Sequence, residues 1–287
     1  MKKKWDGKER RRRFSRMPVK WKVPIQIAIP TVLITLTVSL LNFYQATQAM
    51  EKNRDATYRT LLVDTEKSLR AWLDHIKTDI IVLSATASTA EALLAFSQSW
   101  IFLGGDPTER LQTLYITDNP NPTGEKDKLV QANDGSAWSQ AHGRYHPGLH
   151  RFQADRGYYD VFLFDLEGNV IYSVFKELDF ATNVVDGPYA SSGLGEVFVA
   201  ARELEAGQTY TSGFAPYAPS ADAPAKFIAT PIFSAAGQKV GVLALQIPVD
   251  EIGVILADTE LLGETGLIYI SSAEGLALSA TYDGGPE

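Results

Sequence analysis

The sequence predicts an α+β protein in which a transmembrane helix is followed by a long helix and then by a module built on an antiparallel sheet. Three observations predict this class: an uncharged apolar segment behind a basic N-terminus, an apolar stripe with helical spacing, and paired runs of aromatic and β-branched residues. The 287 residues include no cysteine, which excludes disulfides, thiolate metal sites and cysteine nucleophiles.

The N-terminus is basic although the whole chain has a net charge of −7. Residues 1–22 hold eleven Lys and Arg residues against Asp6 and Glu9, a local net charge of +9. Residues 23–44 carry no charge, and about 20 apolar residues are enough to cross a bilayer core. Because positive charge stays on the cytoplasmic side, we expect a cytoplasmic basic head over 1–22 and a membrane helix over 23–44. This helix would cross the bacterial inner membrane once, with the bulk of the chain outside.

Two alternatives to a membrane anchor fit the N-terminus less well. A cleaved signal peptide usually has an apolar core of about 7–15 residues and a small-residue cleavage site, whereas this core is longer and residues 45–49 make a poor site. Nucleic-acid binding by the Arg10–Arg13 cluster is not expected, because a basic cluster beside a membrane helix serves as a contact for anionic lipids.

A long helix is predicted after the membrane segment. Apolar residues recur every seven positions, and a second set follows four residues later, so that both lie on one stripe of a helix. The two sets are Leu62, Leu69, Ile76, Leu83 and Ala90, and Leu73, Ile80, Ala87 and Leu94. Since the sequence has neither Gly nor Pro between Asn42 and Leu103, we expect one helix over 45–103 and a further helical segment up to residue 117. The stripe suits a homodimer through the long helix, although an ordinary core helix explains it equally well.

The C-terminal half changes from polar connector to strands. Residues 118–157 are rich in turn formers, so an ordered connector with little helix is expected. Residues 158–165 and 170–176 should form a hairpin around the turn at 166–169. The remaining expected elements are a helix over 190–204, a strand within 208–217, a second hairpin from 225–234 and 238–248, and a short helix at 249–258. This order is typical of a PAS-like sensor module, here over 158–260.

An internal repeat lies 107 residues further along the chain. Placing Glu167-Gly168 on Glu274-Gly275 lays Val161–Leu163 over Ile268–Ile270. We therefore expect residues 261–287 to begin a second, truncated module with about two strands, too few to be stable alone.

Several segments of the sequence resemble one protein family. They lie within residues 115–272 and read GEKDKLVQANDGSAWSQAHGRYHP, GYYDVFLFDLEGNVIYSVFKELDFATN, FAPYAPSADAPAKFIATPIF, GVLALQIPVDEI and LLGETGLIYI. Together with the anchor and the long helix, they resemble the double Cache sensor region of methyl-accepting chemotaxis proteins, N-terminal part only. The resemblance implies a region that binds a small molecule outside the cell membrane and transmits the binding across it. The sequence lacks that family's methylation helices and kinase-coupling hairpin, and also the Tyr, Trp and Asp arrangement of its amino-acid-binding members.

The sequence contains no signature of catalysis. HExxH, GxSxG and P-loop motifs do not occur, so neither enzymatic activity nor a cofactor is expected. His142, His146 and His150 would stack on one face of a helix, a spacing that can bind zinc. Pro147 argues against a regular helix there, so we expect surface or structural histidines and no metal site.

A ligand pocket is expected inside the sheet module, where aromatic side chains are mixed with a few polar groups. The candidates come from KELDFATN beside the second strand and FAPYAP on the third, with neighbouring tyrosines: Tyr172, Lys176, Asp179, Asn183, Tyr189, Phe214 and Tyr217. A small polar metabolite, such as a carboxylate paired with Lys176, would suit this mixture. The alternative is that the aromatic residues are core and that Lys176 and Asp179 form a surface pair.

Three functions fit the sequence. The first is the ligand-sensing region of a transmembrane chemoreceptor. The second is the sensor region of a membrane histidine kinase or nucleotide cyclase, and the third is an anchored binding protein without output. The sequence encoded downstream would separate them, because it would hold methylation helices, a kinase or cyclase domain, or neither.

Membrane topology gives the first testable prediction. Reporter fusions at Asp106 and Gly237 should be active only with a reporter that works outside the cytoplasm, because the +9 head keeps residues 1–22 inside. Fusions that are active only with a cytoplasmic reporter would overturn this topology.

Overall fold

The computed structural model describes residues 18–248 and 250–256. The chain divides into two compact units, Met1–Val63 and Asp64–Glu287. Helix α2 (Val19–Ser84) begins in the first unit and includes the expected membrane segment. It contains an 18-residue window with a mean hydropathy of 1.9, none of it buried, so it is long and apolar enough to span a membrane. Hydroxyls such as those of Thr31 and Thr35 donate to carbonyls four residues earlier at 2.8 Å, which satisfies these polar groups within an apolar segment.

The expected single helix over 45–103 is divided in the structure. Helix α2 ends at Ser84, and α3 (Ala87–Ile101) follows after two residues. Thr86 is extended (φ −74°, ψ 139°), and its side chain accepts a hydrogen bond from the Thr89 amide at 3.2 Å. Such a cap starts a new helix without Gly or Pro, so the prediction of an unbroken helix was wrong.

The segment 118–157 holds much more helix than expected. After α4 (Pro107–Gln112), η1 (Thr113–Thr117) and η2 (Lys126–Lys128), helix α5 runs from Ala137 to Arg156 and contains Pro147. Its Ser136 cap accepts from the Ser139 amide at 3.1 Å, and the Trp138 indole donates to the Ile171 carbonyl of the sheet at 3.1 Å. Burial of one face of this helix therefore outweighs the cost of an internal proline.

The sheet confirms the two expected hairpins. Its strands are β1 (Asp160–Phe164), β2 (Val170–Ser173), β3 (Tyr210–Thr211), β4 (Ala215–Tyr217), β5 (Ala223–Phe233) and β6 (Lys239–Ile247). The order is β2-β1-β6-β5-β3, with β4 also paired to β5, and every pairing is antiparallel. Helix α6 (Gly193–Arg202) matches the expected helix over 190–204, η3 (Ala218–Ser220) follows β4, and α7 (Asp250–Leu256) lies within 249–258.

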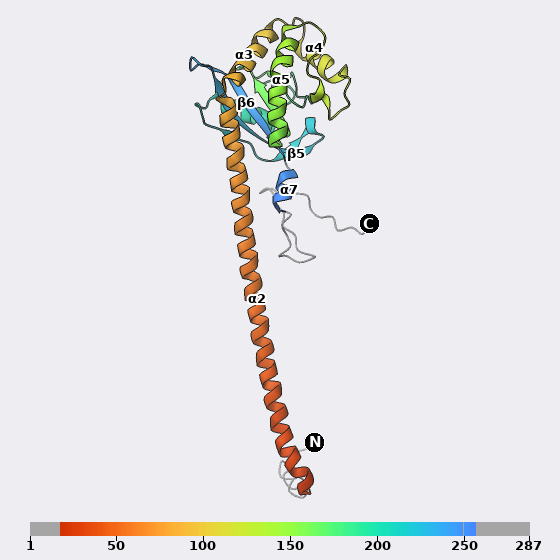
Figure 1. Cartoon of the computed structure of the whole chain (residues 1–287), viewed down its shortest axis with the longest axis vertical. Helices are drawn as coiled ribbons and strands as arrows, with labels where there is room; N and C mark the ends of the chain where they lie inside the picture. The colour runs from red at the N-terminus through yellow and green to blue at the C-terminus, as the bar shows by residue number, and fades with distance from the viewer. Residues whose placement is uncertain (1–17, 249, 257–287) are drawn as a thin grey trace, which may run out of the picture. The chain divides into compact units, whose positions relative to one another are not determined.

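Two apolar layers cover the two faces of the sheet. Val161 and Leu163 of β1 belong to a core shared with α3, α5 and the end of α2. The alternate residues Phe162 and Phe164 belong to a second core with α6, where the rings of Phe164 and Phe198 lie 5.3 Å apart. Figure 1 shows α3 and α5 beside one another next to the sheet. The expected second module over 261–287 lies outside the described residues.

Truncation of a buried residue near the end of α2 tests whether this helix is part of the sheet module. Ile80 is fully buried in the core shared with α3 and α5, whereas Val82 is 60% exposed. Ile80→Ala should lower the free energy of unfolding by about 2–5 kcal/mol. Val82→Ala, the matched control, should change it by less than about 0.5 kcal/mol. Urea denaturation of the full chain in detergent gives both values, and equal losses would contradict this packing.

Candidate functional site

The loop between β2 and α6 is held beside the sheet by backbone hydrogen bonds. The Val170 amide donates to the Thr182 carbonyl at 2.8 Å, and the Ala181 amide donates back to Val170 at 3.1 Å. Lys176 and Ala181 both have left-handed backbone conformations, with φ of +61° and +63°. Non-glycine residues adopt this region at a cost, so the surrounding contacts impose the path of the loop.

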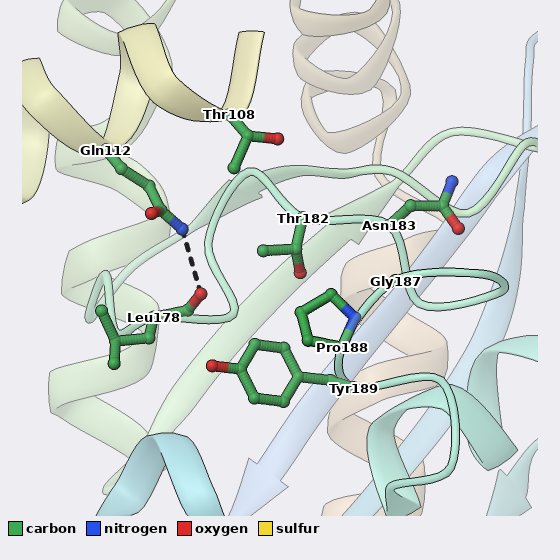
Figure 2. Close-up of a pocket in the computed structure, with 8 residues that line it drawn as sticks. All are labelled: Thr108, Gln112, Leu178, Thr182, Asn183, Gly187, Pro188 and Tyr189. Carbon is green, nitrogen blue, oxygen red and sulfur yellow. Dashed lines mark hydrogen bonds between the residues drawn. The ribbon is translucent and has the colours of Figure 1, made fainter. Parts of the chain in front are cut away.

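A pocket of about 460 Å³ lies between this loop and α4. Figure 2 shows its residues: Thr108, Gln112, Leu178, Thr182, Asn183, Gly187, Pro188 and Tyr189. The Gln112 amide donates to the Leu178 carbonyl at 3.0 Å, and the Thr108 hydroxyl donates to the Ala181 carbonyl at 2.5 Å. These bonds join α4 to the loop, so the two walls of the pocket are mechanically connected. None of the lining residues is charged.

Buried carboxyl groups lie on the inner side of the same loop. Asp179 follows the pocket residue Leu178, is 0% exposed and accepts a hydrogen bond from the Tyr217 hydroxyl at 2.5 Å. Burial raises the pKa of Asp179 to about 7, although the Tyr217 hydroxyl acts in the opposite direction. The ring of Tyr217 lies 6.3 Å from that of Tyr189, which lines the pocket. The loop therefore has the pocket on one side and a carboxyl group on the other.

Asp160 holds the end of the first hairpin. Its Oδ1 accepts hydrogen bonds from the amides of Val161, Val174 and Phe175 at 2.6, 2.8 and 3.0 Å. Burial and then the charge of Asp179 raise the pKa of Asp160 well above its ordinary value, although the three amides lower it. This side chain therefore adds an acceptor for the two amides that follow the last residue of β2, Ser173, although the Val174 amide also donates to the Val161 carbonyl at 3.1 Å.

A third carboxyl group completes this polar region. Glu177 accepts hydrogen bonds from the hydroxyls of Tyr159 and Ser220, both at 2.7 Å. The amide of Gln246 in turn donates to the Ser220 hydroxyl at 3.1 Å. Burial raises the pKa of Glu177, and the two hydroxyls act against this rise. The network links β6, η3 and the loop after β2.

Lys176 occupies the opposite face of the sheet. The residue is 2% exposed, and its ammonium group donates to the Val174 carbonyl at 3.0 Å. The same group lies 5.6 Å from the centre of the Tyr172 ring and 5.8 Å from that of Tyr115. Burial lowers the pKa of Lys176 to about 7, because a charged amine is unfavourable in an apolar core.

The histidines stack along α5 despite Pro147. Ring centres are 4.3 Å apart for His142 and His146, and 5.4 Å apart for His146 and His150. Burial lowers the pKa of His146 to about 2, so its ring is neutral. Its Nε2 donates to the Asp127 carbonyl at 2.6 Å, and its Nδ1 accepts from the Tyr172 hydroxyl at 2.7 Å.

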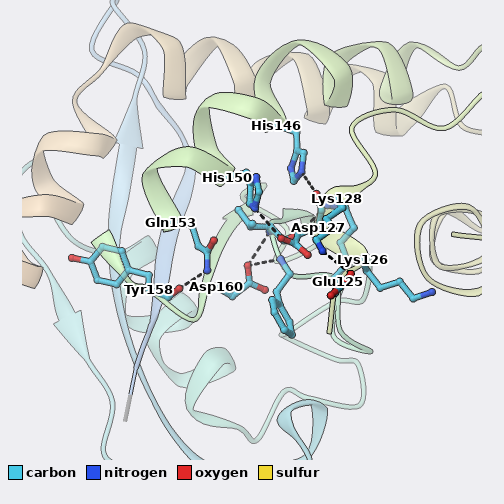
Figure 3. Close-up of polar contacts among 12 residues, drawn as sticks. Glu125, Lys126, Asp127, Lys128, His146, His150, Gln153, Tyr158 and Asp160 are labelled. Carbon is cyan, nitrogen blue, oxygen red and sulfur yellow. Dashed lines mark hydrogen bonds and ion pairs between the residues drawn. The ribbon is translucent and has the colours of Figure 1, made fainter. Parts of the chain in front are cut away.

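The Asp127 carboxylate pairs with His150 at 2.8 Å, as Figure 3 shows. These contacts make the histidines structural, whereas the prediction that Pro147 would prevent a helix here was wrong. The described residues contain no group of three or more His, Cys, Asp or Glu that could hold a metal ion.

The structure distributes the seven predicted site residues over four places. Asn183 and Tyr189 line the pocket, while Asp179 and Tyr217 are bonded to each other behind it. Tyr172 and Lys176 lie on the α5 face, and Phe214 is half-buried with the Lys226 ammonium 5.0 Å from its ring centre. The expected surface pair of Lys176 and Asp179 does not occur, because both are buried. Ligand binding by these residues stays a prediction, as does a carboxylate partner for Lys176.

Sequence reasoning missed the contribution of α4 and two buried polar residues. Thr108 and Gln112 line the pocket, although they lie about 70 positions before the loop residues to which they donate hydrogen bonds. Their proximity to the loop is therefore visible only in the folded chain. Asp160 and Gln246 could have been noticed, because each is a polar residue within an otherwise apolar strand. A buried polar side chain in such a place needs hydrogen-bond partners and is retained for a reason.

The chain is similar to several solved structures of sensor domains. One is the sensor domain of the V. cholerae histidine kinase DctB (18% identity, 58% of this chain, 57% of that chain, TM-score 0.32). Another is the ligand-binding domain of the Pseudomonas fluorescens chemoreceptor CtaA in complex with L-serine (16% identity, 75% of this chain, 73% of that chain, TM-score 0.31). A third is the ligand-binding domain of the Pseudomonas aeruginosa PAO1 amino acid chemoreceptor PctC in complex with GABA (13% identity, 74% of this chain, 77% of that chain, TM-score 0.30).

The first is a sensor domain of a histidine kinase, and the other two are ligand-binding domains of chemoreceptors. The chain spans little more than half of the histidine kinase sensor domain. At TM-scores near 0.3, the likeness is no argument for a shared ligand or output. No family model matches the sequence, and no curated protein matches it.

Replacement of Lys176 with Met tests the buried ammonium group. The pKa of Lys176 is about 7 in the folded chain, below the ordinary 10.5, so the unfolded chain binds more protons between these two values. Stability that depends on Lys176 therefore rises with pH through this window. Urea denaturation should show wild type gaining unfolding free energy relative to Lys176→Met between pH 7 and about pH 10. The control is Lys77→Met, at an exposed position of α2. If the difference in unfolding free energy between wild type and variant does not change with pH for either variant, the buried ammonium group of Lys176 is refuted.

Proposed function

We propose that this chain is the small-molecule sensing region of a transmembrane chemoreceptor of the methyl-accepting type. The basic head over 1–22 would lie in the cytoplasm, residues 23–44 would cross the inner membrane, and the sheet module would face the outside. The observation that carries the proposal is the pocket of about 460 Å³ between α4 and the loop after β2. A pocket of this size suits a small metabolite.

Contacts from the pocket towards α2 support a sensory role. The loop residues Leu178 and Phe180 accept hydrogen bonds from Gln112 of α4 at 3.0 and 2.8 Å. On the same face of the sheet, the Tyr158 hydroxyl donates to Asp79 of α2 at 2.9 Å. Ile76 and Ile80 of α2 lie in the core that also contains Tyr172 and Phe180. A ligand that favours one position of the loop would therefore favour one packing of the end of α2.

The proposal includes a homodimer formed through α2. Leu62, Val63 and Leu73 are 58%, 48% and 40% exposed in the single chain. Leu62 and Leu73 both belong to the stripe of helical spacing. A second copy of the same helix would bury them by coiled-coil packing.

A binding screen with a matched pair of variants tests the sensing function. A ligand at a hundredfold excess over its dissociation constant should stabilise the full chain in detergent by about 2.7 kcal/mol, measured as a rise in melting temperature. Tyr189→Ala removes an aromatic wall of the pocket and should reduce the rise. Tyr210→Ala, which removes an exposed tyrosine bonded to Glu196, should leave it unchanged.

Two outcomes of this screen would contradict different parts of the proposal. A broad metabolite library that leaves the melting temperature of wild type unchanged would contradict the sensing function. A ligand whose effect is the same in Tyr189→Ala and wild type would place binding elsewhere.

A further inference from the structure

Three buried oxygen atoms beside the loop after β2 have no hydrogen-bond partner among the described residues. They are Oδ2 of Asp160, Oδ1 of Asp179 and Oε1 of Gln246. The residues are 0%, 0% and 3% exposed. All three atoms are acceptors, because an amide oxygen and an ionised carboxylate have no proton to donate. This part of the interior therefore lacks a donor, and a buried acceptor without one is costly.

The three atoms belong to side chains on the same side of the sheet. Asp160 of β1 pairs in register with Gln246 of β6, and Gln246 pairs in register with Phe227 of β5. Phe227 belongs to the core around α6, and residues that oppose each other across strands share a face of the sheet. Asp179 reaches this side from the loop. The Tyr217 hydroxyl donates to it at 2.5 Å, and the ring of Tyr217 lies 4.9 Å from that of Phe227.

No ion pair compensates for the charge of these two carboxyl groups. Within residues 18–248 and 250–256, neither Asp160 nor Asp179 takes part in an ion pair. The charge of Asp160 raises the pKa of Lys176, but that ammonium group lies on the α5 side and donates to the Val174 carbonyl. After burial, the charge of Asp179 is the largest cause that raises the pKa of Asp160. Two like charges in one buried place oppose each other's ionisation.

One proton would supply the missing donor and reduce the repulsion. When it binds to either carboxylate, an acceptor oxygen becomes an O–H donor and one of the two negative charges disappears. Burial raises the pKa of Asp179 to about 7, and the pKa of Asp160 is well above its ordinary value. The proton would therefore be bound in mildly acidic solution and released as the pH rises through neutrality.

We propose that Asp160 and Asp179 form a binding site for one proton, so that the chain senses the pH outside the membrane in addition to a small molecule. Release of the proton leaves two buried carboxylates that repel each other. In the loop, Asp179 lies between Leu178, which lines the pocket, and Phe180, which belongs to the same core as Ile80 of α2. Displacement of this loop therefore changes the packing at the end of α2.

The other titratable groups around the pair behave differently. Burial, followed by the charges of neighbouring carboxyl groups, raises the pKa of every tyrosine beside the pair, so these side chains stay neutral: Tyr159, Tyr172, Tyr189 and Tyr217. Burial also raises the pKa of Glu177, whose oxygens accept from two hydroxyls. The pKa of Lys176 is lowered to about 7, so its titration affects stability in the opposite direction. Variants of the pair are needed to separate these contributions.

Infrared spectroscopy of the full chain in detergent tests the site directly, because a protonated carboxylic acid and a carboxylate absorb at different frequencies. Between about pH 6 and about pH 9, wild type should show a protonated carboxyl group that is lost as the pH rises through about 7. Asp179→Asn should lack this signal, since its uncharged amide brings N–H donors without a proton. Asp186→Asn, at an exposed position of the same loop, is the control and should retain the signal.

Tyr217→Phe keeps both carboxyl groups and serves as a second variant if Asp179→Asn does not fold. The Tyr217 hydroxyl lowers the pKa of Asp179, so its removal should move the loss of the signal to higher pH. Wild type without a protonated carboxyl signal at about pH 6, or with a signal that persists unchanged to about pH 9, would overturn the proposal. The same titration in wild type, Asp179→Asn and Tyr217→Phe would also overturn it.

Urea denaturation gives an independent measurement of the same site. The pKa of Asp179 is about 7 in the folded chain, above the ordinary 3.8, so the folded chain binds more protons between these values. Stability that depends on the pair is complete below about pH 4 and is lost as the pH rises through about 7. Relative to Asp179→Asn, the unfolding equilibrium constant of wild type should rise by up to about tenfold for each pH unit in this window. Lys176 is present in both proteins, so its titration cancels, and a ratio that does not change with pH would contradict the proton site.

Discussion

The hydrogen bonds of Asp160 are the constraint on which the candidate site depends. One carboxylate oxygen at the start of β1 accepts the amides of Val161, Val174 and Phe175. These bonds hold the chain just beyond β2, directly before Lys176, whose backbone is left-handed. The loop that follows places Asp179 on the inside and Leu178 at the pocket. Because a buried carboxylate is costly unless it is well bonded, the amides stabilise the acid and the acid fixes the loop.

Different buried polar groups lie on the two faces of the sheet. On the α5 side, Lys176 and neutral His146 are enclosed by aromatic rings and have protein partners. On the α6 side, the carboxyl groups have fewer partners, and Asp179 lies between the pocket and the sheet. The α5 side connects to α2, and on both sides single buried polar atoms have no partner among the described residues, such as Nε2 of His142 on the α5 side and Oδ1 of Asp179 on the α6 side.

Local patterns predicted the sheet better than they predicted the site. Both hairpins could be predicted from the sequence because of the turns at Gly168 and Gly237, where glycine permits a positive φ of 91° and 74°. The helix break at Thr86 could not be predicted, because a threonine that caps a helix cannot be distinguished in the sequence from a polar residue within a helix. Helix α5 crosses Pro147 only because tertiary burial compensates for it. The pocket walls come from segments about 70 residues apart, and such contacts have no local signature.

In the proposed sensor, ligand binding at the loop after β2 changes the packing of the end of α2 through the α5 face of the sheet. Amide hydrogen exchange of the full chain, with and without a compound that raises its melting temperature, measures this most directly. We expect slower exchange within residues 177–189, in α4 and in residues 76–84 of α2, with little change in α6. Protection confined to α6, or protection of the loop without any change in α2, would contradict it.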